Sequence, residues 1–340
     1  MPRRFSWASL PDEDLLTLRL KDLRVTIAGT WLEGCLRDLH RELKRRKLRV
    51  RPHAWISDEW FSPDTTPGIA IPFYLAHPRL MQMERKKIID VEGGSVRECM
   101  RILRHEAGHV IQHSYQLQRR RRWQELFGAS STRYPKYYQP NPRSKRYVQH
   151  LRLWYAQSHP DEDFAETFAV WLTPSSNWRK RYAGWPALKK LQYVHELMKE
   201  IADKKPSLTR RLEIDPLKRL RRTLAEHYKK KQALYVVDSW KAYDKDLRRI
   251  FSAEPGRRGT RTAAAFLGKN RAKIRRAVSK ATGEYQLTLD AVLNEMIGRC
   301  RMMKLWAVGS ERQLRHAFIA LLTAKTVHLL YSPSRQSFAL

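Results

Sequence analysis

The sequence has little cysteine, and its three cysteines, Cys35, Cys99 and Cys300, stand far apart. An odd number of widely spaced cysteines argues against a disulfide framework and against a zinc ribbon built from paired cysteines. This cysteine usage is typical of a protein from a reducing compartment.

Long apolar runs are also missing. The N-terminal region reaches the acidic stretch 12–14 without an apolar run of signal-peptide length. The most apolar late stretch, 318–330, is interrupted by Lys325 and His328, and it is shorter than the roughly 20 residues that cross a bilayer. We therefore expect a soluble, cytoplasmic protein with no membrane segment.

Negative charge is scarce. The 340 residues include 34 Asp and Glu against 67 Lys and Arg, which gives a formal net charge of +33. From Pro206 to the end, 29 basic residues stand against 11 acidic ones. Such an excess predicts an anionic partner, either an acidic peptide substrate or nucleic acid. Basic clusters at 119–122 and 229–231 suit phosphates, although no recognised nucleic-acid-binding motif is present and charged helix faces are commonly only solvated.

The remaining composition predicts a packed core, because 42% of the residues are hydrophobic and 10% are aromatic. Apolar residues at helical spacing predict a helix over 28–47. Alternating residues then predict strands over 48–56 and 68–75, each containing a proline. The Tyr- and Pro-rich stretch 134–142 predicts an ordered but irregular loop.

Two further helices are predicted around the polar motifs. Ser95 followed by Glu98 has the pattern of a capping box, which predicts a helix from Val96 to about Tyr115. Prolines 160 and 174 bracket a shorter helix over 161–172.

Residues 105–109 read His-Glu-Ala-Gly-His and lie in the first of these two helices. His105 and His109 are four residues apart, so both imidazoles lie on one face and can reach a single ion. Glu106 is placed to take a proton from a water that zinc activates. The pattern predicts a zinc site with Glu106 as general base, although a His/His/carboxylate set also accommodates ions such as Fe(II).

A third ligand is expected downstream. His113 is out of register for a third histidine, and we interpret it as a residue of the helix surface. Glu162 and Glu166 are again four residues apart, and either could be the ligand. We favour Glu162 as the zinc ligand and Glu166 as the acceptor of a ring N–H from a ligating histidine, because such carboxylates orient metal-binding imidazoles.

The segment Tyr155-Ala-x-x-His-Pro-x-Glu-Asp-x-Ala-Glu-Thr-Phe-Ala169, placed after the His-Glu-x-x-His helix, resembles the bacterial family of zinc-binding metallopeptidases. The similarity extends upstream through 55–61 and 68–72, and towards 282–285 in the C-terminal part. It implies a zincin-like fold and a peptide or protein substrate.

The Glu-x-x-Ala-Glu-x-Phe pattern at 162–168 is more distantly similar to lethal-factor-type gluzincins. That resemblance implies that Glu162 binds zinc and that Tyr155, seven residues earlier, stabilises the transition state. Since Pro160 lies between them, we expect Tyr155 on the segment that enters the helix. The resemblance also suggests 68–75 as an edge strand that holds an extended substrate.

These observations together predict an α+β fold. A zincin-like metallopeptidase domain over 1–205 would hold a small mixed, mostly antiparallel sheet beside the His-Glu-x-x-His helix, and a basic all-helical region would follow over 206–340. The predicted function is that of a zinc metallopeptidase, most simply an endopeptidase. The alternative is a nucleic-acid-associated protein, either a DNA-dependent protease or a binding module with a non-catalytic metal site.

Overall fold

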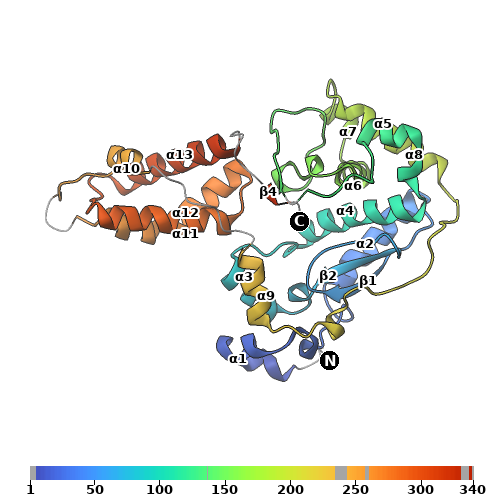
Figure 1. Ribbon diagram of the computed structural model, residues 1–340, viewed down its shortest axis with the longest axis horizontal. Helices are drawn as coiled ribbons and strands as arrows, with labels where there is room; N and C mark the ends of the chain where they lie inside the picture. Colours follow the sequence, from blue (N-terminus) through green and yellow to red (C-terminus); the bar gives the residue numbers. More distant parts are fainter. Residues whose placement is uncertain (1–4, 136, 234–242, 257–259, 331–336, 339–340) are drawn as a thin grey trace. The chain divides into compact units, whose positions relative to one another are not determined.

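The computed structural model describes residues 5–135, 137–233, 243–256, 260–330 and 337–338 (Figure 1). The chain forms two compact units. Unit 1 comprises Met1–Lys87, Val91–Lys230 and Gln336–Leu340, and unit 2 comprises Ile88–Asp90 and Lys231–Arg335. Among the described residues, no helix is both long enough and apolar enough to cross a bilayer.

Unit 1 is mostly helical. Its α-helices are α1 (Asp12–Thr17), α2 (Leu32–Arg45), α3 (Pro78–Ile88), α4 (Val96–Ser114), α5 (Arg121–Phe127), α6 (Pro160–Leu172), α7 (Trp178–Arg181), α8 (Ala187–Glu200) and α9 (Leu224–Ala233), the last of which continues past the unit boundary. Its short 3₁₀ helices are η1 (Ser6–Ser9), η2 (Leu20–Leu23), η3 (Phe73–Ala76), η4 (Leu117–Arg119), η5 (Arg152–Gln157) and η6 (Leu217–Arg219). Its strands are β1 (His53–Ser57), β2 (Gly68–Pro72) and the two-residue strands β3 (Tyr137–Tyr138) and β4 (Ser337–Phe338), which pair antiparallel. The predicted α+β class is therefore confirmed only in part, as a mostly helical chain with little sheet.

Helix α2 confirms the amphipathic helix predicted over 28–47, although it begins only at Leu32. Its buried apolar face consists of Leu32, Cys35, Leu39 and Leu43. This face packs towards α4, and Glu42 accepts two hydrogen bonds of 2.7 Å from the guanidinium of Arg104. Because both side chains are largely buried, the paired contact fixes α4 against α2.

The two predicted strands are present only in part, because residues 48–52 precede β1 and residues 73–75 belong to η3. They run parallel, with His53 opposite Gly68. The expected mostly antiparallel sheet is therefore wrong. The loop 58–67 carries the chain back to the end of the sheet at which β1 began, so that β2 runs in the same direction. Strand β1 begins directly after Pro52, which has no N–H to give to a ladder.

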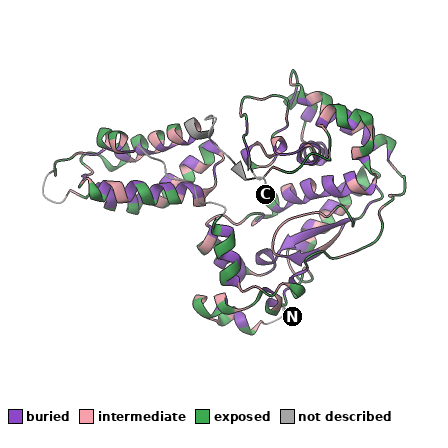
Figure 2. Ribbon diagram, in the orientation of Figure 1, coloured by how far each residue is buried: buried purple, intermediate pink, exposed green. Residues whose placement is uncertain are grey.

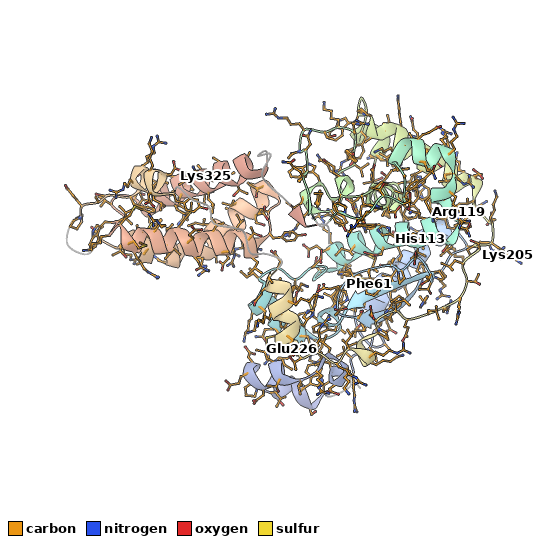
Figure 3. All side chains as sticks on the ribbon, viewed as in Figure 1. Phe61, His113, Arg119, Lys205, Glu226 and Lys325 are labelled. Carbon is orange, nitrogen blue, oxygen red and sulfur yellow. The ribbon has the colours of Figure 1, made fainter. Side chains whose placement is uncertain are left out.

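Strand β2 does not offer the open edge that we expected for a substrate. All five of its residues are buried, and Ala70 is bridged to Trp55 of β1 on one side and, on the other, to Phe61, which is labelled in Figure 3. The second bridge includes a hydrogen bond of 2.8 Å from the Ala70 N–H to the Phe61 carbonyl. At this position the chain itself occupies the place predicted for an extended peptide.

The segment 206–230, which belongs to the predicted basic region, lies in unit 1. Its backbone carbonyls accept hydrogen bonds from side chains of β1: the indole of Trp55 donates to Ile214, and the hydroxyl of Ser57 donates to Asp215. These contacts tie the segment to the sheet. The basic composition of residues 206–230 therefore does not set them apart from the first unit.

Helices α4 and α6 pack against one another at the centre of unit 1, and Figure 2 shows that both are largely buried. Every residue of α6 from Asp161 to Leu172 is buried, including three carboxylates in its first turn. Buried carboxylates require partners, because leaving a charge uncompensated in a low-dielectric interior is costly. The contact between α4 and α6 is therefore a candidate functional site.

Unit 2 contains the helices α10 (Asp244–Ile250), α11 (Ala263–Thr282), α12 (Gln286–Met302) and α13 (Glu311–Leu330). Its hydrophobic core is formed by buried residues of these helices, among them Leu247, Leu267, Ile274, Leu293, Met296 and Phe318. In α12 the apolar residues between Leu289 and Cys300 recur at helical spacing and are buried. The helical character predicted for the C-terminal region agrees with the structure of this unit.

Candidate metal centre

The local sequence determines where α4 begins. The hydroxyl of Ser95 accepts a hydrogen bond of 3.3 Å from the Glu98 N–H, which caps the helix as the sequence predicts. From this start the helix runs to Ser114, so residues 105–109 lie in its regular interior. His105, Glu106 and His109 are all buried.

Helix α6 begins at Pro160, where the absent N–H costs nothing. His159 is its N-cap, and the ring Nδ1 accepts a hydrogen bond of 3.1 Å from the Asp161 N–H. The positive end of the helix dipole favours carboxylates in the first turn, where Glu162 lies. The packing of α6 on α4 directs this carboxylate towards the two imidazoles.

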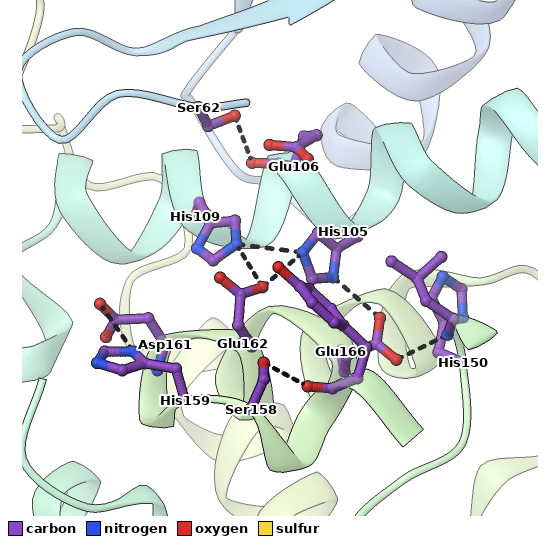
Figure 4. A network of polar contacts seen from close by, with 12 residues as sticks. Ser62, His105, Glu106, His109, His150, Ser158, His159, Asp161, Glu162 and Glu166 are labelled. Atoms are coloured by element: carbon purple, nitrogen blue, oxygen red, sulfur yellow. Dashed lines mark hydrogen bonds and ion pairs between the residues drawn. The ribbon is translucent and has the colours of Figure 1, made fainter. Parts of the chain in front are cut away.

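Three buried side chains converge on one point between the helices (Figure 4). Glu162 Oε2 lies 3.0 Å from His105 Nε2 and 3.2 Å from His109 Nε2, and the two Nε2 atoms are 3.2 Å apart. Within the described residues, this is the group of His and carboxylate side chains that could hold a metal ion.

Glu162 Oε2, His105 Nε2 and His109 Nε2 form a triangle of donor atoms. The dimensions of this triangle fit a zinc ion. Donors bound to zinc at about 2.0–2.1 Å with tetrahedral angles lie roughly 3.3 Å from one another. The observed separations of 3.0–3.2 Å come close to that value. Two neutral imidazole nitrogens and a carboxylate oxygen are also the donor types that zinc takes in catalytic sites. Three protein donors leave a fourth position for solvent.

The tautomer of His105 is consistent with metal binding. Its Nδ1 lies 2.9 Å from Glu166 Oε1, which accepts the ring N–H, so that in the neutral ring the lone pair is on Nε2. The other oxygen of Glu166 accepts a hydrogen bond of 2.7 Å from the Leu151 N–H. Both oxygens of Glu166 are therefore engaged away from the triangle, and Glu162 is the carboxylate that faces it.

The imidazoles and carboxylates of this cluster stabilise one another's charged forms. Burial by itself lowers the pKa of His105, but its hydrogen bonds to Glu162 and Glu166 outweigh that effect and raise the pKa well above its usual value. The pKa of His109 is also raised, because the charge of Glu162 outweighs burial. Conversely, burial raises the pKa of Glu162, but the imidazoles of His109 and His105 outweigh it and lower the pKa.

Glu106 lies beside the triangle but not in it. The residue is 6% exposed, and its Oε2 has no hydrogen-bond partner within the described part of the chain. The backbone of the same residue is held by the hydroxyl of Ser62, which donates to the Glu106 carbonyl at 3.2 Å. An orphan carboxylate oxygen is costly to bury. The negative charge of Glu106 helps to raise the pKa of His109, so the carboxylate lies within electrostatic reach of the three-donor cluster.

Tyr155 lies on η5, the segment that leads into α6, as the position of Pro160 suggested. Its ring centroid is 5.7 Å from that of His105. Burial, with the negative charge of Glu162 as a further cause, raises the pKa of its phenol well above the usual value. The hydroxyl therefore keeps its proton at neutral pH and can act as a hydrogen-bond donor.

His113, the third histidine of α4, lies outside the triangle. His113 is half-buried, and its ring stacks on that of His109 with centroids 6.5 Å apart. Its pKa is lowered by burial and by the neighbouring His109. It stands one helical turn beyond His109, which agrees with its interpretation as a residue of the helix and not as a ligand.

Sequence reasoning missed Tyr134. Its hydroxyl donates to Glu162 Oε1 at 2.9 Å, and its ring stacks on His159. The only signal was the tyrosine-rich composition of 134–142, which predicts an ordered loop but not where that loop lies. Most of the stretch is irregular, as expected, apart from the two residues of β3.

Comparison with known proteins gave no match among the curated proteins and none among the solved structures. A family comparison did give a match. It covers α4 and α6 and all of the side chains that form the triangle. Residues 82–180 match the model of the family described as "Putative zinc-binding metallo-peptidase", which confirms over this segment the resemblance drawn from the sequence.

Proposed function

We propose that this protein is a zinc-dependent endopeptidase whose metal is bound by His105, His109 and Glu162. The single observation that carries the proposal is the triangle of Nε2, Nε2 and Oε2 atoms beside the orphan carboxylate of Glu106. The family match over residues 82–180 supports the same chemistry.

Each residue then has a task. Zinc supplies Lewis acidity, which makes water nucleophilic at neutral pH and polarises a carbonyl. Glu106 accepts the proton of the attacking water as the new carbon–oxygen bond forms. It then gives this proton to the amide nitrogen as the carbon–nitrogen bond breaks, which leaves a carboxylic acid and an amine. The acid then passes the second proton of the water to the amine, so the final products are a carboxylate and an ammonium group. Tyr155 donates a hydrogen bond to the negative charge that develops on the former carbonyl oxygen.

The test compares the wild-type protein with Glu106→Gln. Zinc content is measured by elemental analysis, and cleavage is measured on casein and on a peptide library that includes acidic sequences. We expect the variant to keep stoichiometric zinc and to lose cleavage, because an amide occupies the same space but cannot accept the proton. A wild-type protein that contains no zinc, or that cleaves no peptide after zinc loading, would contradict the proposal.

A second candidate function, nucleic-acid binding, is favoured by the exposed face of α11. This helix contains no acidic residue. Lys273, Arg276 and Lys280 are exposed and recur at helical spacing, so they form one positive stripe. Such like charges repel one another along a helix face. An anionic backbone laid along the stripe would relieve that repulsion.

This second candidate can be tested with a labelled DNA duplex at several salt concentrations. The variant K273E/R276E/K280E should bind more weakly, and its salt dependence should fall by about one unit of slope for each phosphate that the protein no longer neutralises. The variant R41E/K44E/R45E, which reverses three exposed charges on α2, is the control for net charge. Equal effects of the two variants would show that only overall charge matters. Peptide cleavage measured with and without the duplex would reveal a DNA-dependent protease.

A further inference from the structure

Glu162 presents its two oxygens to different partners. Oε2 faces the imidazoles of His105 and His109. Oε1 accepts a hydrogen bond of 2.9 Å from the hydroxyl of Tyr134. Because hydrogen bonds to a carboxylate are charge-assisted, this contact restrains the rotation of the carboxyl group about its last side-chain bond.

Tyr134 is held in place by the N-cap residue of α6. Its ring stacks on the ring of His159, with centroids 3.7 Å apart and planes inclined by 13°. The Nε2 of that histidine donates to the Thr132 carbonyl at 2.7 Å, while its Nδ1 accepts from the Asp161 N–H. One histidine therefore caps α6 and also anchors the segment that carries Tyr134.

The exposure of Tyr134 indicates what the residue is for. It is 45% exposed, so filling the core does not explain a tyrosine here. Stacking on His159 would be served equally well by phenylalanine. The feature that only tyrosine provides at this position is the hydroxyl, and the hydroxyl is directed to the carboxylate that faces both imidazoles.

We propose that Tyr134 is a positioning residue of the metal centre, which keeps Glu162 bound through Oε2 alone. This inference rests on the proposed function, because it assumes that Glu162 is a zinc ligand. While the hydroxyl holds Oε1, the carboxylate supplies one donor atom and a coordination position stays open for water. Without the hydroxyl, the carboxylate is free to turn, to offer both oxygens, or to point away.

The test uses Tyr134→Phe, which keeps the stacked ring and removes only the hydroxyl. Zinc affinity is measured by competition with a chelator, and we expect it to fall about 10–100-fold, as is usual when the hydrogen-bond partner of a metal ligand is removed. Tyr115→Phe is the matched control, since that hydroxyl donates to the Lys204 carbonyl and does not contact the triangle. It should leave the affinity unchanged.

A second measurement separates positioning from general loosening of the fold. Cobalt(II) in place of zinc absorbs strongly in a four-coordinate site and weakly in a five-coordinate one. We expect Tyr134→Phe to weaken and shift the cobalt spectrum, and Tyr115→Phe to leave it as in the wild type. His159→Asn keeps a side chain able to cap α6 but removes the ring under Tyr134, and it should change the spectrum in the same direction.

The possible outcomes distinguish this inference from the proposed function. If the wild-type protein binds neither zinc nor cobalt, the metallopeptidase proposal itself fails. If the wild type binds both ions, and Tyr134→Phe binds them with unchanged affinity and spectrum, only the role of Tyr134 is wrong. A tenfold or greater loss of zinc affinity with an altered cobalt spectrum, in this variant and not in Tyr115→Phe, supports it.

Discussion

Gly108 of α4 lies directly against Ala165 of α6, so closely that a Cβ atom on residue 108 would stand 2.7 Å from the Ala165 Cα and 3.1 Å from its carbonyl oxygen. The middle of the His-Glu-Ala-Gly-His motif is therefore a point of very close approach between the two helices. The absence of a side chain here lets Glu162, one turn earlier in α6, reach the imidazoles of α4. The glycine contributes to the site through packing, without contacting the metal position itself.

Replacing Gly108 by alanine should consequently damage both stability and metal binding. Alanine is favoured in helices by up to about 1 kcal/mol over glycine, but the new methyl group meets the backbone of Ala165. Overpacking of this kind typically costs about 1–3 kcal/mol, so we expect net destabilisation together with weaker zinc binding. Urea unfolding and a zinc titration measure the two effects.

The control for this substitution is Gly268→Ala in α11, where a Cβ atom would have no heavy atom within 4 Å. There the helix propensity acts alone, and the variant should be more stable by roughly 0.5–1 kcal/mol. A Gly108→Ala variant that gained stability in the same way would contradict the close approach of the two helices.

The two carboxylates of α6 should respond differently to truncation. Glu162→Ala removes the carboxylate oxygen that faces both imidazoles, and stoichiometric zinc should be lost. Glu166→Ala removes the acceptor of the His105 ring N–H, and zinc affinity should fall about 10–100-fold. Glu166→Gln keeps one acceptor oxygen and should lose less. Zinc titrations decide the assignment, and an interchange of the two results would mean that Glu166 is the ligand.

Tyr155→Phe should affect the rate of cleavage and leave metal binding almost intact. Removing one hydrogen-bond donor to a developing oxyanion typically lowers kcat about 10²–10³-fold. We expect a loss of that size, with KM and zinc content close to wild type. Tyr138→Phe is the matched control, because its ring lies 6.3 Å from that of Tyr155 and its hydroxyl donates to the Leu153 carbonyl. Equal losses of kcat in both variants would indicate a packing role for Tyr155.

The sequence predicted the parts of this site that depend on local geometry. Four-residue spacing in a helix places His105 beside His109, and the same rule applies to Glu162 and Glu166. Capping residues and prolines marked where α4 and α6 begin. These features depend on a few neighbouring residues, and for that reason they can be inferred without knowledge of the tertiary structure.

The features that the sequence did not predict depend on the path of loops. The loop 58–67 makes β1 and β2 parallel, and Phe61 within it bridges Ala70, where a peptide had been expected. The segment around Tyr134 brings a hydroxyl to Glu162 across 28 residues of sequence. No periodicity encodes either path, because irregular backbone follows from tertiary contacts and not from local propensity.

The buried charges predict how pH affects the metal-free protein. The pKa values of His105 and His109 are raised in the folded state, so their contribution to stability is present below the unfolded value of about 6.5 and is lost as pH rises through their folded pKa values. The pKa values of Glu162 and Glu166 are lowered, so their contribution is present above about 4.5 and is lost as pH falls. These four groups therefore stabilise the metal-free fold most between about pH 4.5 and pH 6.5.

Towards alkaline pH, zinc should reverse the sign of the dependence of stability on pH. The ion binds neutral imidazoles, so it must displace the protons that the carboxylates stabilise on His105 and His109. Its affinity, and with it the stabilisation at a fixed zinc concentration, should rise as pH increases from about 6 to 8. The measurement is the difference in Tm with and without zinc at each pH, in which the titration of distant groups cancels. Glu162→Ala should show no zinc-dependent difference at any pH. A wild-type difference that stayed constant or shrank over this range would mean that zinc binds without displacing protons from these two histidines, and therefore not at this site.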